Sequence, residues 1–166
     1  SPAWRGRMLE GGPLIDCGVH QIDLVRWISG LEVKACDGFG SWLSNFESPD
    51  HITAHLQLEN DVTASIEVSF TYGHTAREPR SVFTYEMIGT GGVARFDRDG
   101  YILEARDGHG VIQVPGTGEK NFDGMYAQFL RYIEQGEVGF LASPQDALIA
   151  SEVAIECTDK AIRKRK

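Results

Sequence analysis

Hydrophobic and polar residues alternate most regularly between residues 51 and 72, where they predict two antiparallel strands, 51–59 and 62–72. One face of these strands is apolar and consists of Ile52, Ala54, Leu56, Leu58, Val62, Ala64, Ile66, Val68, Phe70 and Tyr72. Polar residues occupy most of the positions between them, and Asn60-Asp61 predicts the connecting turn. A two-residue period with a single apolar face indicates a sheet that is covered on one side only.

Shorter apolar runs predict more strands, at residues 82–88, 95–100, 101–106 and 110–114. The stretch 95–100 is interpreted as a short strand that runs into a hairpin turn, and Asp107-Gly108 as a second hairpin-type turn. Residues 33–46 have a mixed pattern. Residues 1–13 predict an extended lead-in.

Three stretches have helical spacing instead. The first follows the glycines and proline at 11–13 and ends at Gly30, in the place of a C-terminal cap. The second ends at Gly136 and has a stripe that is predicted as core: Phe122, Met125, Tyr126, Phe129, Leu130 and Ile133. The third begins with Ser143 as N-cap and Pro144 in the first position. Its predicted core stripe is Leu148, Ser151, Ala154, Ile155, Thr158, Ala161 and Ile162.

A helix, a run of six or seven strands and two closing helices predict an α+β fold. We expect a largely antiparallel open sheet with helices packed on one face. At 166 residues the chain is long enough for one domain with a substantial core and short for two. Residues 1–166 are therefore predicted to form a single domain.

The first helix carries a polar stripe of Asp16, His20, Asp23 and Trp27, at steps of four, three and four residues. Buried ionisable groups need partners or a function, and an aspartate one turn before a histidine supplies both. The carboxylate can orient the ring and favour its charged form, which suits an acid/base catalyst near neutral pH. Spacing alone leaves an alternative open: Asp16 at the positive helix end and His20 with local hydrogen bonds.

Resemblance to a known family favours the catalytic interpretation. The stretch Gly11-Gly12-Pro13-Leu14-Ile15-Asp16-Cys17-Gly18-Val19-His20-Gln21-Ile22-Asp23-Leu24 resembles a signature of the glucose–fructose oxidoreductase / inositol dehydrogenase (Gfo/Idh/MocA) family. That signature lies in the second, C-terminal domain of the family and reads roughly Gly-Gly-Gly-x-x-x-Asp-x-Gly-x-His-x-x-Asp. Glu10 stands where the first glycine would be. The two closing helices also resemble the family's, so the resemblance covers nearly the whole chain.

The resemblance implies the substrate-binding half of an oxidoreductase that acts on a sugar, inositol or related polyol with NAD or NADP. It implies that His20 is the general acid/base and that Asp16 orients its ring. It also implies substrate contacts from Asp23 and from an arginine near the start of the chain, for which Arg5 is a better candidate than Arg7. The alternative is a non-catalytic module for sheet-mediated oligomerisation or ligand binding.

The cofactor itself is expected to bind elsewhere in the parent protein and not in this chain. Residues 89–94 fit G-x-G-x-x-A, but a dinucleotide fingerprint must open a helix, and the next residues, 95–100, leave no room for one. We interpret Gly89 to Gly92 as a tight turn between strands. The Glu-Lys-Pro motif of the family is also absent, because Glu119-Lys120 is followed by Asn121. The isolated chain is therefore expected to be inactive.

Composition narrows the partners and the compartment. The net charge of −8 argues against nucleic acid and anionic membranes, and no apolar run is long enough for a membrane span. Three scattered cysteines indicate reduced thiols in a cytoplasmic protein. The start at Ser-Pro-Ala, without Met, indicates a fragment of a larger protein. The basic run 163–166 is interpreted as a cap of the last helix that frays into solvent, and not as a binding site.

The polar face of the strands at 51–72 is rich in Thr, Ser, Gln, Glu and His and poor in Lys. We expect it to pack against a second copy across a two-fold axis, which gives a homodimer through the open sheet face. His51 and His55 share this face, but no third ligand follows at a recognisable spacing. No metal site is predicted.

Overall fold

The computed structural model describes residues 2–71, 77–78, 82–97, 102–115 and 120–165. Tyr72, residues 98–101 and Lys166, which belong to predicted elements, lie outside the described residues. The chain divides into two compact units, Ser1–Pro79 with Ala142–Lys166, and Arg80–Leu141. Each unit is described by itself, and the interpretation of residues 1–166 as one domain stays a prediction.

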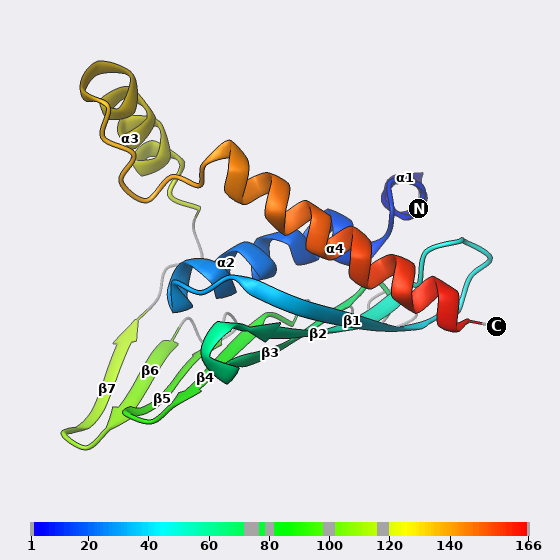
Figure 1. Ribbon diagram of the computed structural model, residues 1–166, viewed down its shortest axis with the longest axis horizontal. Coiled ribbons are helices and arrows are strands. Elements are labelled where there is room, and N and C mark those ends of the chain that lie inside the picture. The colour runs from blue at the N-terminus through cyan, green and yellow to red at the C-terminus, as the bar shows by residue number, and fades with distance from the viewer. Residues whose placement is uncertain (1, 72–76, 79–81, 98–101, 116–119, 166) are drawn as a thin grey trace. The chain divides into compact units, whose positions relative to one another are not determined.

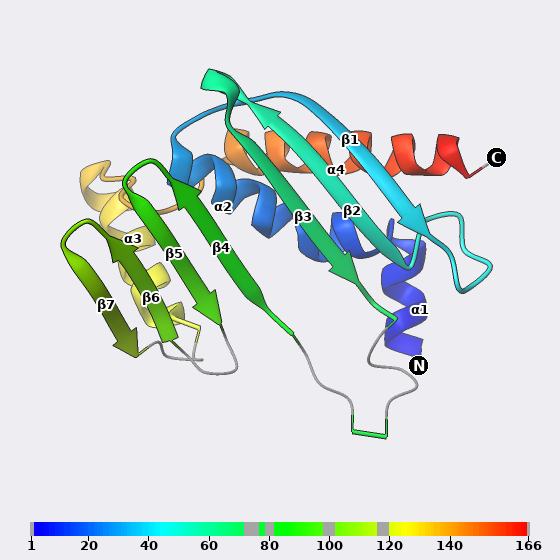
Figure 2. The same cartoon turned by 90° about the horizontal axis from the view of Figure 1, so that it is seen from below.

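The first unit contains a three-stranded antiparallel sheet in the order β1-β2-β3 (Figure 2). Its strands are β1 Val33–Ser41, β2 His51–Leu58 and β3 Thr63–Ser69, and a short 3-10 helix η2, Glu59–Asp61, joins the last two. Its helices are α1 Pro2–Leu9, the π-helix η1 Leu14–Gly18, α2 Val19–Ser29 and α4 Pro144–Lys164. The strands predicted at 51–59 and 62–72 are confirmed as β2 and β3.

The core lies between this sheet and its helices, as the alternating pattern requires. Ile52, Ala54, Leu56, Leu58 and Ile66 are at most 5% exposed and face the helices. α4 packs along β1, as Figure 1 shows, and also contacts η1 and α2. The prediction of helices on one sheet face is confirmed for this unit.

Small residues allow α4 to approach β1 closely. Ala150, Ala154 and Cys157 are buried, and a Cβ atom on Gly38 would lie 2.0 Å from the Cys157 carbonyl oxygen. Leu148 and Ile155, which the sequence pattern placed in the core, are 50% and 46% exposed. That part of the predicted stripe is wrong, because backbone-to-backbone packing selects for the smallest side chains, not for the largest apolar ones.

The start of the chain is helical, and the predicted extended lead-in over residues 1–13 is wrong. α1 begins with Pro2 in its first position, where a missing N–H has no effect on helical hydrogen bonds. Met8 anchors the helix and is 2% exposed. Gly11 and Gly12 then adopt φ angles of 121° and 84°, a region that favours glycine, and turn the chain into η1.

The second unit contains a four-stranded antiparallel sheet in the order β4-β5-β6-β7 and one helix (Figure 2). The elements are β4 Thr84–Gly89, β5 Gly92–Asp97, β6 Ile102–Asp107, β7 Gly110–Pro115 and α3 Phe122–Gln135. Gly89 pairs with Gly92 across a tight turn, as predicted. The α+β prediction is confirmed, with seven antiparallel strands among the described residues, divided between two sheets.

The strand register gives the second sheet one apolar face and one face of mixed charged and apolar residues. Paired positions on the apolar face are Tyr85, Met87, Ala94, Phe96, Leu103, Ala105, Ile112 and Val114. On the opposite face Glu86, Arg95, Glu104 and Gln113 form one row. Gln113 and Arg106 both donate to the Glu104 carboxylate, at 2.6 and 2.7 Å. Ile112 and Val114 of the apolar face are 63% and 48% exposed.

α3 ends where the sequence predicts but does not have the predicted burial. The Asn121 side chain accepts a hydrogen bond from the Gly124 N–H at 3.0 Å, and Gly136 ends the helix with φ 75°. Phe122, Tyr126, Phe129, Leu130 and Ile133 are all at least 50% exposed. The prediction that this stripe is core is therefore wrong, because helical spacing identifies an apolar face without identifying what covers it.

Among the described residues, no helix combines the length and the apolar character that crossing a membrane requires.

Candidate active site

The predicted polar stripe follows the first unit's η1 and α2. Ile22 anchors α2 in the core and has no exposed surface. The helix ends at Gly30, whose N–H donates to the Arg26 carbonyl at 2.8 Å. Gly18 packs against Leu14 and Val68, which holds the start of α2 close to β3. His20 and Trp27 are exposed, and the Asp16 and Asp23 side chains are 28% and 36% exposed. The stripe therefore faces solvent from a well-packed helix.

A π-turn separates Asp16 from His20. Asp16 lies in η1, whose wider turn changes the angular relation between residues four apart. Its carboxylate Oδ2 lies 3.8 Å from Arg7 Nε and accepts a hydrogen bond from Cys17 Sγ at 3.2 Å. Among the described residues, no direct hydrogen bond or ion pair joins Asp16 to His20. The orientation of the ring by Asp16 stays a prediction.

Arg7, not Arg5, is the arginine that the structure brings to Asp16. Arg7 reaches Asp16 from α1, and its guanidinium carbon lies 6.0 Å from the centre of the Phe70 ring. Arg5 is exposed, and its substrate contact stays a prediction. Burial, and then the neighbouring Asp16, raise the pKa of Cys17 to about 11. The thiol stays protonated and acts as a hydrogen-bond donor to the carboxylate.

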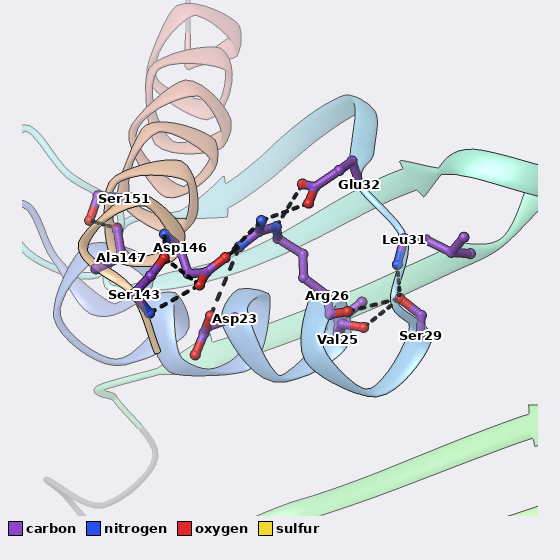
Figure 3. Close-up of polar contacts among 10 residues, drawn as sticks. All are labelled: Asp23, Val25, Arg26, Ser29, Leu31, Glu32, Ser143, Asp146, Ala147 and Ser151. Carbon is purple, nitrogen blue, oxygen red and sulfur yellow. Dashed lines mark hydrogen bonds and ion pairs between the residues drawn. The ribbon is translucent and has the colours of Figure 1, made fainter. Parts of the chain in front are cut away.

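Asp23 lies beside a buried arginine that the sequence analysis did not single out (Figure 3). Arg26 is 7% exposed, and its guanidinium donates two hydrogen bonds to Glu32, from Nε at 2.9 Å and from Nη2 at 2.8 Å. It also donates to Asp146 Oδ1 at 3.2 and 3.3 Å, and Asp23 Oδ1 lies 4.0 Å from Nη1. One guanidinium thus links α2, the lead-in to β1 and the start of α4.

The charges in this cluster stabilise one another. The hydrogen bonds from Arg26 lower the pKa of Glu32, and those same contacts raise the pKa of Arg26. The pKa of Asp146 is lowered first by Ser143, which it caps reciprocally at the start of α4, and then by Arg26. A signal was present in the sequence: Arg26 occupies a place in an otherwise apolar row of the helix.

The stripe carries the kinds of side chain that acid/base chemistry on a hydroxylated molecule requires. His20 has an exposed imidazole. Asp16 and Asp23 offer hydrogen-bond acceptors, and Arg7 offers a donor, for the hydroxyl groups of a ligand. Among the described residues, no group of three or more His, Cys, Asp or Glu side chains is placed to hold a metal ion. The substrate role of Asp23 and the catalytic roles of His20 and Asp16 stay predictions.

Comparisons with known proteins agree with the resemblance noted in the sequence. Residues 1–95 match the GFO/IDH/MocA C-terminal domain. Over 90 residues the chain is 30% identical to scyllo-inositol 2-dehydrogenase (NAD(+)) from Bacillus subtilis, a match that covers 50% of this chain and 24% of that protein.

Two solved structures share the fold across most of the chain. UDP-N-acetylglucosamine 3-dehydrogenase from Acidithiobacillus ferrooxidans has a TM-score of 0.72 at 16% identity, covering 87% of this chain and 45% of that one. An oxidoreductase from Agrobacterium radiobacter, in complex with NAD+, L-tartaric acid and magnesium, has a TM-score of 0.69 at 19% identity. That match covers 90% of this chain and 46% of the other. The chain thus spans less than half the length of these relatives.

Proposed function

This chain belongs to the GFO/IDH/MocA family of oxidoreductases, and we propose that it is the substrate-binding and oligomerisation half of an NAD(P)-dependent dehydrogenase. The substrate class is a sugar, inositol or related polyol. This choice is supported by the names of two relatives, an inositol dehydrogenase and a nucleotide-sugar dehydrogenase. The three free thiols, two of them buried, suit the reducing cytoplasm.

One observation carries the proposal: the family-matched segment presents His20, exposed, on a helix that is otherwise anchored in the core. In the proposed reaction the imidazole accepts the proton of a substrate hydroxyl while the carbon that bears it is oxidised. Asp16 stabilises the charged imidazole through a bridging water, and Asp23 and Arg5 bind neighbouring hydroxyls. General acid/base catalysis of this kind contributes about 10²- to 10⁴-fold in rate.

The Gly89–Gly92 turn does not fit a dinucleotide. Gly89 and Gly92 pair with each other in the β4–β5 hairpin, and β5 follows directly, so no helix N-terminus is available there for a pyrophosphate. We infer that the hydride acceptor is held by another part of the parent protein. For the same reason we expect this chain alone to be inactive.

The test uses the full parent protein with scyllo-inositol, myo-inositol and glucose as probes and NAD or NADP as acceptor. His20→Ala should lower the turnover by a factor of about 10² or more without lowering the melting temperature. His109→Ala is the matched control, because His109 is an exposed residue of the β6–β7 turn. Full activity in His20→Ala would refute the acid/base role.

A second function is favoured by the absence of a direct Asp16–His20 contact. In that case the chain is a non-catalytic module whose sheet assembles with other copies or binds a ligand. A parent protein that reduces neither cofactor with any polyol, while retaining a defined oligomeric state, would support this alternative.

We also propose a homodimer through the open face of the first sheet. That face carries His51, His55, Ser65 and Glu67, and these polar side chains contact one another. Ser65 Oγ lies 3.0 Å from His55 Nδ1, and Glu67 lies 3.9 Å from His51. Light scattering should give twice the 18.3 kDa mass of the chain. Ser65→Asp combined with Ser69→Asp should yield monomers. A monomeric wild type at tens of micromolar, the range where a biological interface of about 1,000 Å² or more should hold, would refute the dimer.

A further inference from the structure

β1 has a free edge in the first sheet, and the last turns of α4 follow it. In the described sheet β1 pairs only with β2. In an antiparallel edge strand every second residue turns its N–H and its C=O away from the neighbouring strand. Such a row of unpaired groups is a template for another strand, and proteins commonly protect it.

Side chains occupy this row in β1. Lys160 Nζ donates to the Cys36 carbonyl at 2.7 Å, and Lys164 Nζ donates to the Gly38 carbonyl at 3.2 Å. The Gly38 N–H donates to the Asp37 carboxylate at 2.9 Å, so both backbone groups of Gly38 have side-chain partners. The Cys36 carbonyl and both backbone groups of Gly38, at the centre of β1, thus already have hydrogen-bond partners.

The spacing of the lysines matches the spacing of the carbonyls. Lys160 and Lys164 are four residues apart on α4, a rise of about 6 Å. Cys36 and Gly38 are two residues apart on β1, about 6.6 Å. Because α4 runs beside β1 (Figure 1), successive lysines of the helix reach successive outward carbonyls of the strand.

Each lysine is in turn held by an acidic residue. Glu156 lies 2.6 Å from Lys160 Nζ, one turn earlier on α4, and Asp37 forms an ion pair with Lys164. The Lys164 ammonium also lies 3.8 Å from the centre of the Phe39 ring. These contacts lower the pKa of Glu156 and of Asp37, so both carboxylates stay charged at neutral pH. The predicted fraying of the basic C-terminal run is therefore wrong for Lys164.

We propose that Lys160 and Lys164 close the edge of β1 against strand addition, and that the partner they exclude is the β1 strand of a second copy. Removal of the two ammonium groups leaves the Cys36 and Gly38 carbonyls free, and an antiparallel β1 strand from another copy can then accept and donate along the edge.

The test compares Lys160→Met/Lys164→Met with Arg163→Met in this chain. Arg163 lies on the same helix and donates to the Asp159 carbonyl of its own turn, so its loss removes a charge without opening the edge. Sizing with light scattering should show a larger species than wild type for the double variant and an unchanged mass for Arg163→Met. A fluorescent peptide with the sequence of residues 33–41 should bind the double variant at least tenfold more tightly than it binds wild type.

A double variant with the wild-type mass and no gain in peptide binding would overturn the proposal. Circular dichroism checks that each variant folds. If the double variant does not fold, Lys164→Met alone frees only the Gly38 carbonyl. It should then show a smaller gain in peptide binding, and no gain would equally overturn the proposal.

Discussion

The two sheets have the same kind of sequence pattern and opposite degrees of cover. In β1–β3 the apolar face is closed by α4, η1 and α2, and Ile52, in β2, has no exposed surface. In β4–β7 the apolar face is just as continuous in register, but Ile112, in β7, is 63% exposed. Alternation therefore predicts a strand and its apolar face, whereas closure depends on a helix that can approach the sheet.

Ile52→Ala should show the largest effect, because it opens a cavity in the covered sheet. We expect a loss of about 3 kcal/mol in the free energy of unfolding of the first unit. All three tryptophans, Trp4, Trp27 and Trp42, belong to this unit, so urea unfolding followed by tryptophan fluorescence reports on it. A loss below about 1 kcal/mol would mean that this face is not closed.

Arg26→Met should have the second largest effect, a loss of about 2 kcal/mol in the free energy of unfolding of the first unit. The variant leaves the Glu32 and Asp146 carboxylates without the cation that they share. This loss is smaller than that expected for a fully buried ion pair, because both carboxylates are partly exposed. The same fluorescence measurement gives the value.

This effect should depend on pH. Arg26 lowers the pKa of Glu32 in the folded protein, so the contribution of the pair is complete above the carboxyl's ordinary value of 4.5. It is lost as the pH falls through the folded-state pKa. The stability difference between wild type and Arg26→Met should thus shrink below about pH 4.5. A difference that stays constant down to pH 3 would contradict the ion pair.

Ser143→Ala tests how firmly the start of α4 is fixed over the first sheet. The Ser143 hydroxyl accepts from the Asp146 N–H at 3.1 Å, and the Asp146 carboxylate accepts from the Ser143 N–H at 3.0 Å. Loss of the cap should cost about 1 kcal/mol in urea unfolding. Ser151→Ala, a mid-helix change on the same helix, should be nearly neutral.

Ile112→Ala should have the smallest effect and is the counterpart of Ile52→Ala in the open sheet. With most of its side chain already in water, we expect a loss of about 0.5 kcal/mol or less. Far-UV circular dichroism must be used here, because the second unit has no tryptophan. A loss as large as that of Ile52→Ala would show that the second sheet is covered in solution.

Local signals in the sequence predicted much of the fold. Gly30, Gly136 and Ser143 cap the helices where their residue types indicate. Gly89 and Gly92 form the predicted turn between two strands, and a strand follows them instead of the helix that a dinucleotide loop needs. The buried residues of β2 and β3 followed from the two-residue period, except that Val62 of the predicted apolar face is 39% exposed, whereas the buried Cys36 of β1 did not. These features depend on a few neighbouring residues, so a single sequence contains them.

Features that depend on distant partners were missed. Arg26 is buried because Asp146 reaches it from 120 residues away, and Arg7 meets Asp16 because α1 folds back after Gly11 and Gly12. The π-helix at Asp16 changes the spacing that the sequence pattern predicts as α-helical. Small residues of α4 are buried in preference to Leu148 because Gly38 lets two backbones approach. Of these residues only Arg26 has a local sequence signal, its place in an otherwise apolar row of the helix, and that signal does not identify its distant partner Asp146.

The candidate active site is built on the closed unit. Native-state hydrogen exchange can test this, because amides in well-packed elements exchange only through large-scale opening. We expect the amides of α2, which carries His20 and Asp23, to exchange as slowly as those of β2. Amides of β6 should exchange faster by a factor on the order of 100 or more. Exchange in α2 as fast as in β6, or equal protection of β2 and β6, would contradict the claim.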